Sequence, residues 1–94
     1  MGLARVLKDQ RKVDVAIALF KRALELDRKR YGDSHDFVGI SAYSLGNAYM
    51  AAYEYEPALE YLHLARDIFQ RSRGADDQRT RRAADRIEML ENLV

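Results

Sequence analysis

The residues Ser34, His35 and Asp36 are of the types that form a hydrolase triad. A triad is assembled in space, because adjacent residues cannot align as nucleophile, base and orienting acid. We therefore expect this segment to start a helix, capped by Asp33 or Ser34, with His35 packed in the linker. The chain has no cysteine, which excludes thiol catalysis and disulfide scaffolds. The sequence predicts no catalytic residue and no enzymatic activity.

A second group with chemical potential is an acidic stripe around His63. Glu56, Glu60, His63 and Asp67 recur every three or four residues, so a helix would carry them on one face. Carboxylates and imidazole can hold a divalent metal, but carboxylates on one rigid surface helix rarely surround an ion. A solvated acidic face is the expectation, and a weak metal site is the alternative. Since no glycine-rich phosphate loop occurs either, the sequence predicts no metal and no cofactor.

Composition narrows the range of partners. The 94 residues have a net charge of +1, and residues 31–70 carry six acids against one base. A continuous basic surface for nucleic acid is therefore not expected. The longest apolar run, Val15 to Phe20, is too short to cross a bilayer, and the N-terminus lacks the core of a secretion signal. We expect a cytoplasmic protein that binds neither nucleic acid nor membrane.

The elements that must position these side chains are helices separated by glycines. Gly32 and Gly74 are 42 residues apart, and the same offset relates apolar positions along the chain, such as Ala16 to Ala58 and Ala23 to Ala65. The pattern predicts one domain over residues 1–94, with a first repeat at 1–34, a second at 35–76 and a terminal helix at 77–94. Five helices are expected, at about 2–9, 13–30, 35–52, 55–73 and 77–93.

These repeats resemble a known family. Leu45-Gly46-Asn47-Ala48-Tyr49, followed by Tyr55-Glu56-Pro57-Ala58, Leu62 and Ala65, is similar to a tetratricopeptide repeat (TPR), with a period of 42 as in kinesin light chains rather than the usual 34. The first repeat keeps Leu3, Ala4, Leu7, Ala16, Phe20 and Ala23, and the usual turn glycine is replaced by Arg11 and Tyr53. The resemblance implies an all-α solenoid of antiparallel helix hairpins, about two and a half repeats long. It also implies a non-enzymatic protein–protein interaction module.

Packing expectations follow from the repeat. Gly46 in a helix interior costs about 1 kcal/mol relative to alanine, which close approach of the next helix at Ala58 would offset. Phe20 and Leu62 are expected to fill the space between hairpins. The short first helix leaves its own apolar residues and the adjoining helix face incompletely covered, which favours self-association by exchange of a terminal helix. An assembly scaffold is therefore the alternative function. The first-helix residues concerned are Leu3, Val6 and Leu7.

The helix at 35–52 carries two stripes. Val38, Ala42, Leu45, Tyr49 and Ala52 form the expected core face. The second stripe, Ile40, Tyr43, Ser44, Asn47 and Met50, suits recognition, although Ile40 and Met50 could simply pack on neighbouring helices.

In the TPR family the first helices line a concave groove, and the offset extends the second stripe to Arg5 and Lys8 and to Arg82, Asp85, Arg86, Met89 and Asn92. By the resemblance, Asn47 matches an amide that contacts peptide backbone, and Arg82 and Arg86 match carboxylate-clamp positions, whereas Tyr43 and Ser44 depart from such clamps. We expect an acidic peptide partner, because bases outnumber acids in the groove. The predicted binding residues are Arg5, Lys8, Ile40, Tyr43, Asn47, Met50, Arg82 and Arg86.

Overall fold

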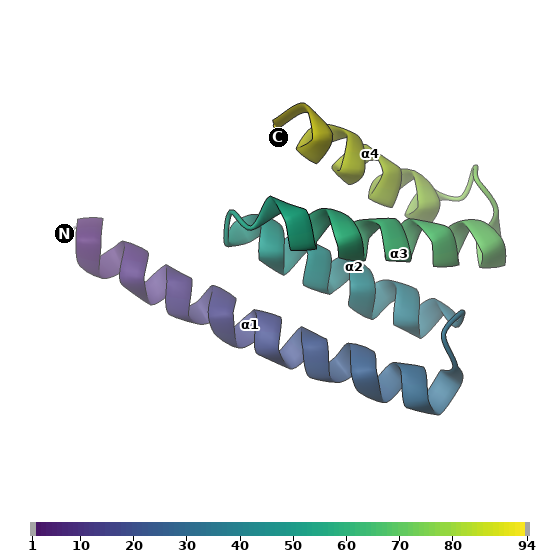
Figure 1. Cartoon of the computed structure of the whole chain (residues 1–94), viewed down its shortest axis with the longest axis horizontal. Helices are drawn as coiled ribbons and strands as arrows, with labels where there is room; N and C mark the ends of the chain where they lie inside the picture. The colour runs from purple at the N-terminus through teal and green to yellow at the C-terminus, as the bar shows by residue number, and fades with distance from the viewer. Residues whose placement is uncertain (1, 94) are drawn as a thin grey trace.

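The computed structural model describes the backbone of residues 2–93 and the side chains of residues 11–93. It contains four helices and no strand within residues 2–93: α1 (Gly2–Tyr31), α2 (Asp36–Ala51), α3 (Tyr55–Arg73) and α4 (Gln78–Leu93). Successive helices run antiparallel (Figure 1), and each packs mainly on its neighbours in the chain, α1 on α2, α2 on α3 and α3 on α4. The predicted all-α hairpin architecture is confirmed.

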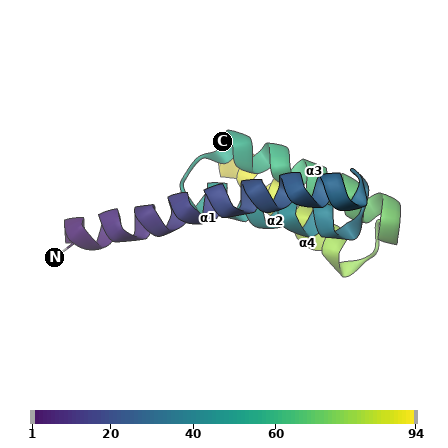
Figure 2. The ribbon, with the colours of Figure 1, turned by 90° about the horizontal axis from the view of Figure 1, so that it is seen from below.

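The N-terminal region differs from the prediction. A break between helices at 2–9 and 13–30 was expected, but α1 is one continuous helix of 30 residues. The segment Gln10-Arg11-Lys12 contains no glycine or proline, and all three residues are good helix formers, so nothing ends the helix there. The first part of α1 therefore projects beyond α2 instead of folding back on the second part (Figures 1 and 2). The division into repeats at 1–34, 35–76 and 77–94 stays a prediction.

The turns depend on left-handed backbone conformations. Gly32 has φ +87° and Gly74 has φ +94°, and their amides donate to Arg28 O at 3.0 Å and Gln70 O at 2.9 Å to close α1 and α3. Tyr53, between α2 and α3, has φ +61° although it is not a glycine. Tyr53 occupies the position where the TPR resemblance implies a turn glycine. The backbone there has the positive φ typical of glycine, a conformation that is unfavourable for a residue with a Cβ atom.

His35 caps α2. Its Nδ1 accepts a hydrogen bond from the Phe37 amide at 3.0 Å, and its ring stacks on Tyr31 with centroids 4.6 Å apart. The expected packing of His35 in the linker is confirmed, whereas capping by Asp33 or Ser34 was wrong. The helix begins at Asp36, so His35 holds the position next to the free amides of the first turn.

The core lies between α2 and α3. Ala58 and Leu62 are fully buried, and a Cβ added at Gly46 would lie 2.8 Å from Leu62 Cγ and 3.2 Å from Ala58 O. The expected close approach at Gly46 is therefore confirmed. The predicted core stripe of α2 is buried at Val38, Ala42, Leu45 and Tyr49. Phe20 packs against this core but remains half-buried.

Polar contacts link successive helices. At the start of α2 the Asp36 carboxylate accepts from the Ser72 hydroxyl at 2.6 Å and from Arg73 Nε at 3.0 Å, and Arg73 Nη2 lies 2.8 Å away. The Ser72 hydrogen bond, followed by the bond and charge of Arg73, lowers the pKa of Asp36. Between α1 and α2 the Ser41 hydroxyl donates to Asp27 at 2.6 Å. These contacts fix the relative positions of the helices at the end where both glycine turns lie.

Candidate functional site

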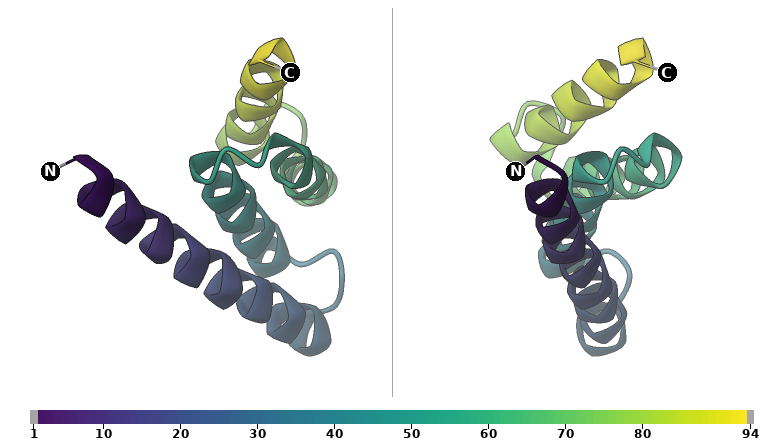
Figure 3. Two further views of the ribbon diagram at one scale, coloured as in Figure 1. Left: turned by 60° about the vertical axis from the view of Figure 1, so that its left-hand side comes forward. Right: turned by 90° about the vertical axis from the view of Figure 1, so that its left-hand side faces the viewer.

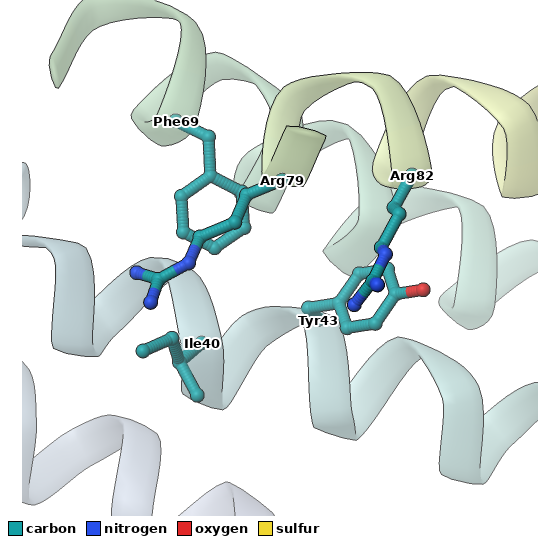
Figure 4. Close-up of a pocket in the computed structure, with 5 residues that line it drawn as sticks. All are labelled: Ile40, Tyr43, Phe69, Arg79 and Arg82. Atoms are coloured by element: carbon teal, nitrogen blue, oxygen red, sulfur yellow. The ribbon is translucent and has the colours of Figure 1, made fainter. Parts of the chain in front are cut away.

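Part of the second stripe of α2 lines a hollow of about 270 Å³ between α2, α3 and α4. Its floor is Phe69 of α3, which is 3% exposed. The side chains of Arg79 and Arg82 extend from α4 toward the α2 residues (Figure 4). The lining residues are Ile40, Tyr43, Phe69, Arg79 and Arg82.

The hollow combines apolar surface with uncompensated positive charge. Within residues 11–93, no carboxylate lies within ion-pair distance of Arg79 or Arg82. The charge of Arg79 contributes, after Ser72 and Arg73, to the lowered pKa of Asp36, so this acid is nearby, but its carboxylate is already bound at the end of α3. Two guanidinium groups over aromatic and aliphatic side chains can bind a carboxylate that carries an apolar neighbour.

Asn47 lies in a different hollow. Together with Ser44 it faces α1 across a space of about 410 Å³. The Asn47 Oδ1 atom is buried and has no hydrogen-bond partner among the described side chains, and a buried polar atom without a partner is unfavourable. The second stripe of α2 is therefore split, with Ile40 and Tyr43 toward α4 and Ser44 and Asn47 toward α1. The α1 residues of this hollow are Lys12, Val13, Ala16 and Phe20.

Of the other predicted binding residues, Met50 and Arg86 lie outside both hollows. Met50 is half-buried against the core, as the packing alternative expected, whereas Ile40 is 39% exposed and lines the first hollow. Arg86 is partly exposed on α4 and lines neither hollow. The side chains of Arg5 and Lys8 lie outside the described residues. The expectation that they lie on a separate first helix is wrong, because α1 is continuous there, and their role in binding stays a prediction.

Two lining residues, Arg79 and Phe69, were not among the predicted binding residues. Arg79 precedes Arg82 by three residues and so shares its helix face, which was a usable signal. Phe69 had no such signal. Its counterpart one repeat earlier is Asp27, so the offset that identified the other positions does not mark it as part of a groove.

The alternative chemistries gain no structural support. Within the described side chains, no group of three or more His, Asp and Glu residues is placed to hold a metal. In the segment that resembles a triad by residue type, His35 accepts from a backbone amide and Asp36 binds Ser72 and Arg73. No helix within residues 2–93 is both long enough and apolar enough to span a bilayer.

Comparison with known proteins identifies the fold family. Residues 1–71 match the tetratricopeptide repeat family model. The chain is 27% identical over 82 residues to the Clustered mitochondria protein homolog of Debaryomyces hansenii, which covers 87% of this chain and 6% of that protein.

The chain is also 40% identical over 55 residues to the RxLR effector protein SFI4 of Phytophthora infestans. This match covers 58% of this chain and 16% of that protein. The chain thus spans a small part of both relatives, and no solved structure matches it. The family model covers most of the chain and the helices pack as antiparallel hairpins, so the chain belongs to the tetratricopeptide repeat family.

Proposed function

We propose that this domain is a non-enzymatic interaction module that binds an acidic segment of a partner protein in the hollow between α2, α3 and α4. Membership of a family of protein–protein interaction repeats supports the general function. The observation that carries the specific proposal is that Arg79 and Arg82 lie above the apolar lining of this hollow and that neither guanidinium has a carboxylate partner within residues 11–93.

The hollow favours one kind of peptide. A Glu or Asp side chain would bind between Arg79 and Arg82, where charge-assisted hydrogen bonds to guanidinium are short and directional. An apolar residue next to it would pack on Ile40 and Phe69, with Tyr43 at the side. A hollow of about 270 Å³ contacts only a short part of a peptide, so we expect a dissociation constant in the micromolar range or weaker.

Asn47 extends the proposed site toward α1. Its carboxamide has an unsatisfied oxygen and lies beside the apolar residues of the second hollow. A peptide that continues from the first hollow along α2 would bring backbone amides near this group. We therefore expect Asn47→Ala to weaken binding of long peptides more than of short ones, because only long peptides reach this hollow.

The test compares two matched peptides. A fluorescent peptide that contains Glu next to Leu is titrated by anisotropy in low salt, against the same peptide with Gln in place of Glu. Wild type should prefer the acidic peptide at least tenfold, and Arg79→Gln with Arg82→Gln should remove this preference. Arg81→Gln is the control for each of the two arginine changes taken singly, since it removes one charge from α4 outside the hollow. Salt should reduce the preference, because exposed charges are screened.

Three outcomes would contradict the proposal. These are stronger binding of a basic peptide, equal binding by the double variant, and an equal loss in the Arg81→Gln control. A duplex DNA probe tests the nucleic-acid alternative, which predicts tighter binding of the DNA than of the peptide. Absence of enzymatic activity and a cytoplasmic location remain part of the proposal.

A further inference from the structure

One apolar face of α1 is only partly covered by α2, whereas the equivalent face of α3 is buried. On α3, the residues that meet α2 are buried: Ala58, Leu62 and Ala65 are 0% exposed and Ile68 is 3% exposed. The same positions one repeat earlier are Ala16, Phe20, Ala23 and Leu26. Leu26 is 56% exposed and the other three are half-buried, and the adjacent Leu19 is 62% exposed. The face of α1 that matches the buried face of α3 is therefore only partly covered, because α2 is the one helix that packs on it within residues 2–93.

The sequence of this chain contains a segment suited to cover that face. Leu3, Ala4 and Leu7 stand 42 residues before Leu45, Gly46 and Tyr49 of α2. In α2, Gly46 and Tyr49 contact α3. The residue at the Gly46 position must be small, because an added Cβ would lie 2.8 Å from Leu62 Cγ. Ala4 stands at this position in residues 2–9, and alanine is the smallest residue after glycine. Residues 2–9 therefore have the residue pattern of a helix that could pack on α1 as α2 packs on α3.

Within one copy this segment cannot reach the face. In the continuous helix α1, residues 4 and 16 are separated by a rise of about 18 Å. The segment instead projects away from the body (Figure 3). We propose that two copies of the chain exchange it: residues 2–9 of each copy pack antiparallel on the partly covered apolar face of α1 of the other, forming a symmetric dimer.

The α2–α3 interface gives the register of this dimer. The contact of Gly46 with Ala58 and Leu62 predicts that Ala4 of one copy lies between Ala16 and Phe20 of the other. Tyr49 stacks on Tyr61 with ring centroids 5.7 Å apart. The residues 42 positions earlier are Leu7 and Leu19, so we expect Leu7 of one copy to contact Leu19 of the other. Each contact occurs twice, because the arrangement is symmetric.

Cysteine crosslinking tests the register directly, since the chain has no cysteine of its own. In the variant Ala4→Cys, Ala16→Cys the two sulfurs come within disulfide distance only across the dimer, or in a chain that bends at residues 10–12. We expect mild oxidation to give a covalent species of twice the 10.9 kDa chain mass on a non-reducing gel. Ala4→Cys, Ala18→Cys is the matched control, because Ala18 is exposed on a different side of α1.

Two measurements complete the test. Sedimentation at rising concentration should show wild type approaching twice the chain mass, and Leu19→Glu with Leu26→Glu should shift the dimer dissociation constant at least tenfold. Both residues are exposed in a single copy, so these variants should fold, and Met89→Glu on α4 (44% exposed) is the control that should not shift it. A crosslink found only within one chain, an equal yield in the Ala18 control, or an unchanged dissociation constant would overturn the proposal.

Discussion

The close approach of α2 and α3 predicts that Gly46→Ala destabilises the protein. In a solvated helix this change would stabilise by about 1 kcal/mol. Here the new methyl carbon would lie 2.8 Å from Leu62 Cγ and 3.2 Å from Ala58 O. Leu62 is fully buried and Ala58 O belongs to the backbone, so neither can move freely. Overpacking of this kind costs about 1–3 kcal/mol, and we expect a net loss of about 1 kcal/mol.

Removing the obstructing side chain should reverse the sign. In a Leu62→Ala background two of the three close atoms are absent, so Gly46→Ala should be neutral or stabilise by up to about 1 kcal/mol, a coupling of about 1–2 kcal/mol. Urea denaturation followed by circular dichroism measures the four free energies of unfolding. Ser44→Ala, on the same helix, should change stability by less than about 0.5 kcal/mol. If Gly46→Ala is equally harmful in both backgrounds, or stabilises wild type, the inferred helix contact is refuted.

Further outcomes are expected from other positions. Leu62→Ala should lower the free energy of unfolding by about 3–5 kcal/mol and Phe20→Ala by only about 1–2 kcal/mol, because Phe20 is half-buried; equal losses in denaturation would contradict this difference. Tyr53→Gly should raise stability by about 1 kcal/mol in thermal melts, because φ is +61° at Tyr53. The lowered pKa of Asp36 means that its contribution to stability is complete above the unfolded pKa, near 3.9, and is lost as the pH falls through the lower folded value. Asp36→Asn should flatten that part of the pH dependence.

The repeat made much of the fold predictable. Gly32 and Gly74 punctuate the chain and adopt the left-handed conformations that end α1 and α3. The small pair Gly46 and Ala58 correctly marked a close contact between α2 and α3. These features are local or are repeated along the chain, so sequence spacing alone can reveal them.

Two features of the structure could not be predicted from residue spacing: the continuity of α1 and the meeting of α3 and α4 side chains in the first hollow. Whether the chain turns near Arg11 depends on the balance between helix propensity and packing. The 42-residue offset relates Arg11 to Tyr53, which lies in the turn between α2 and α3, and a turn near Arg11 was predicted for this reason. Arg79 and Phe69 meet in the first hollow because α3 and α4 cross there, and a helical pattern gives the face of a residue but not the angle at which two helices cross.

The proposed peptide site and the proposed dimer interface overlap at Ala16 and Phe20 of α1, so binding of a long peptide and dimerisation should affect each other. The hollow that contains Arg79 and Arg82 is built from α2, α3 and α4, whereas the Asn47 hollow includes Ala16 and Phe20 of α1, which the proposed dimer covers. A peptide confined to the first hollow should therefore bind monomer and dimer equally. A longer peptide that reaches Asn47 should compete with dimerisation, and the two equilibria must be coupled by the same factor in both directions.

In the dimer locked by Ala4→Cys and Ala16→Cys, binding should still depend on the two arginines but no longer on Asn47. Anisotropy titrations of the locked and reduced protein measure this difference, and an undiminished effect of Asn47→Ala in the locked dimer would show that the exchanged segment does not cover the second hollow.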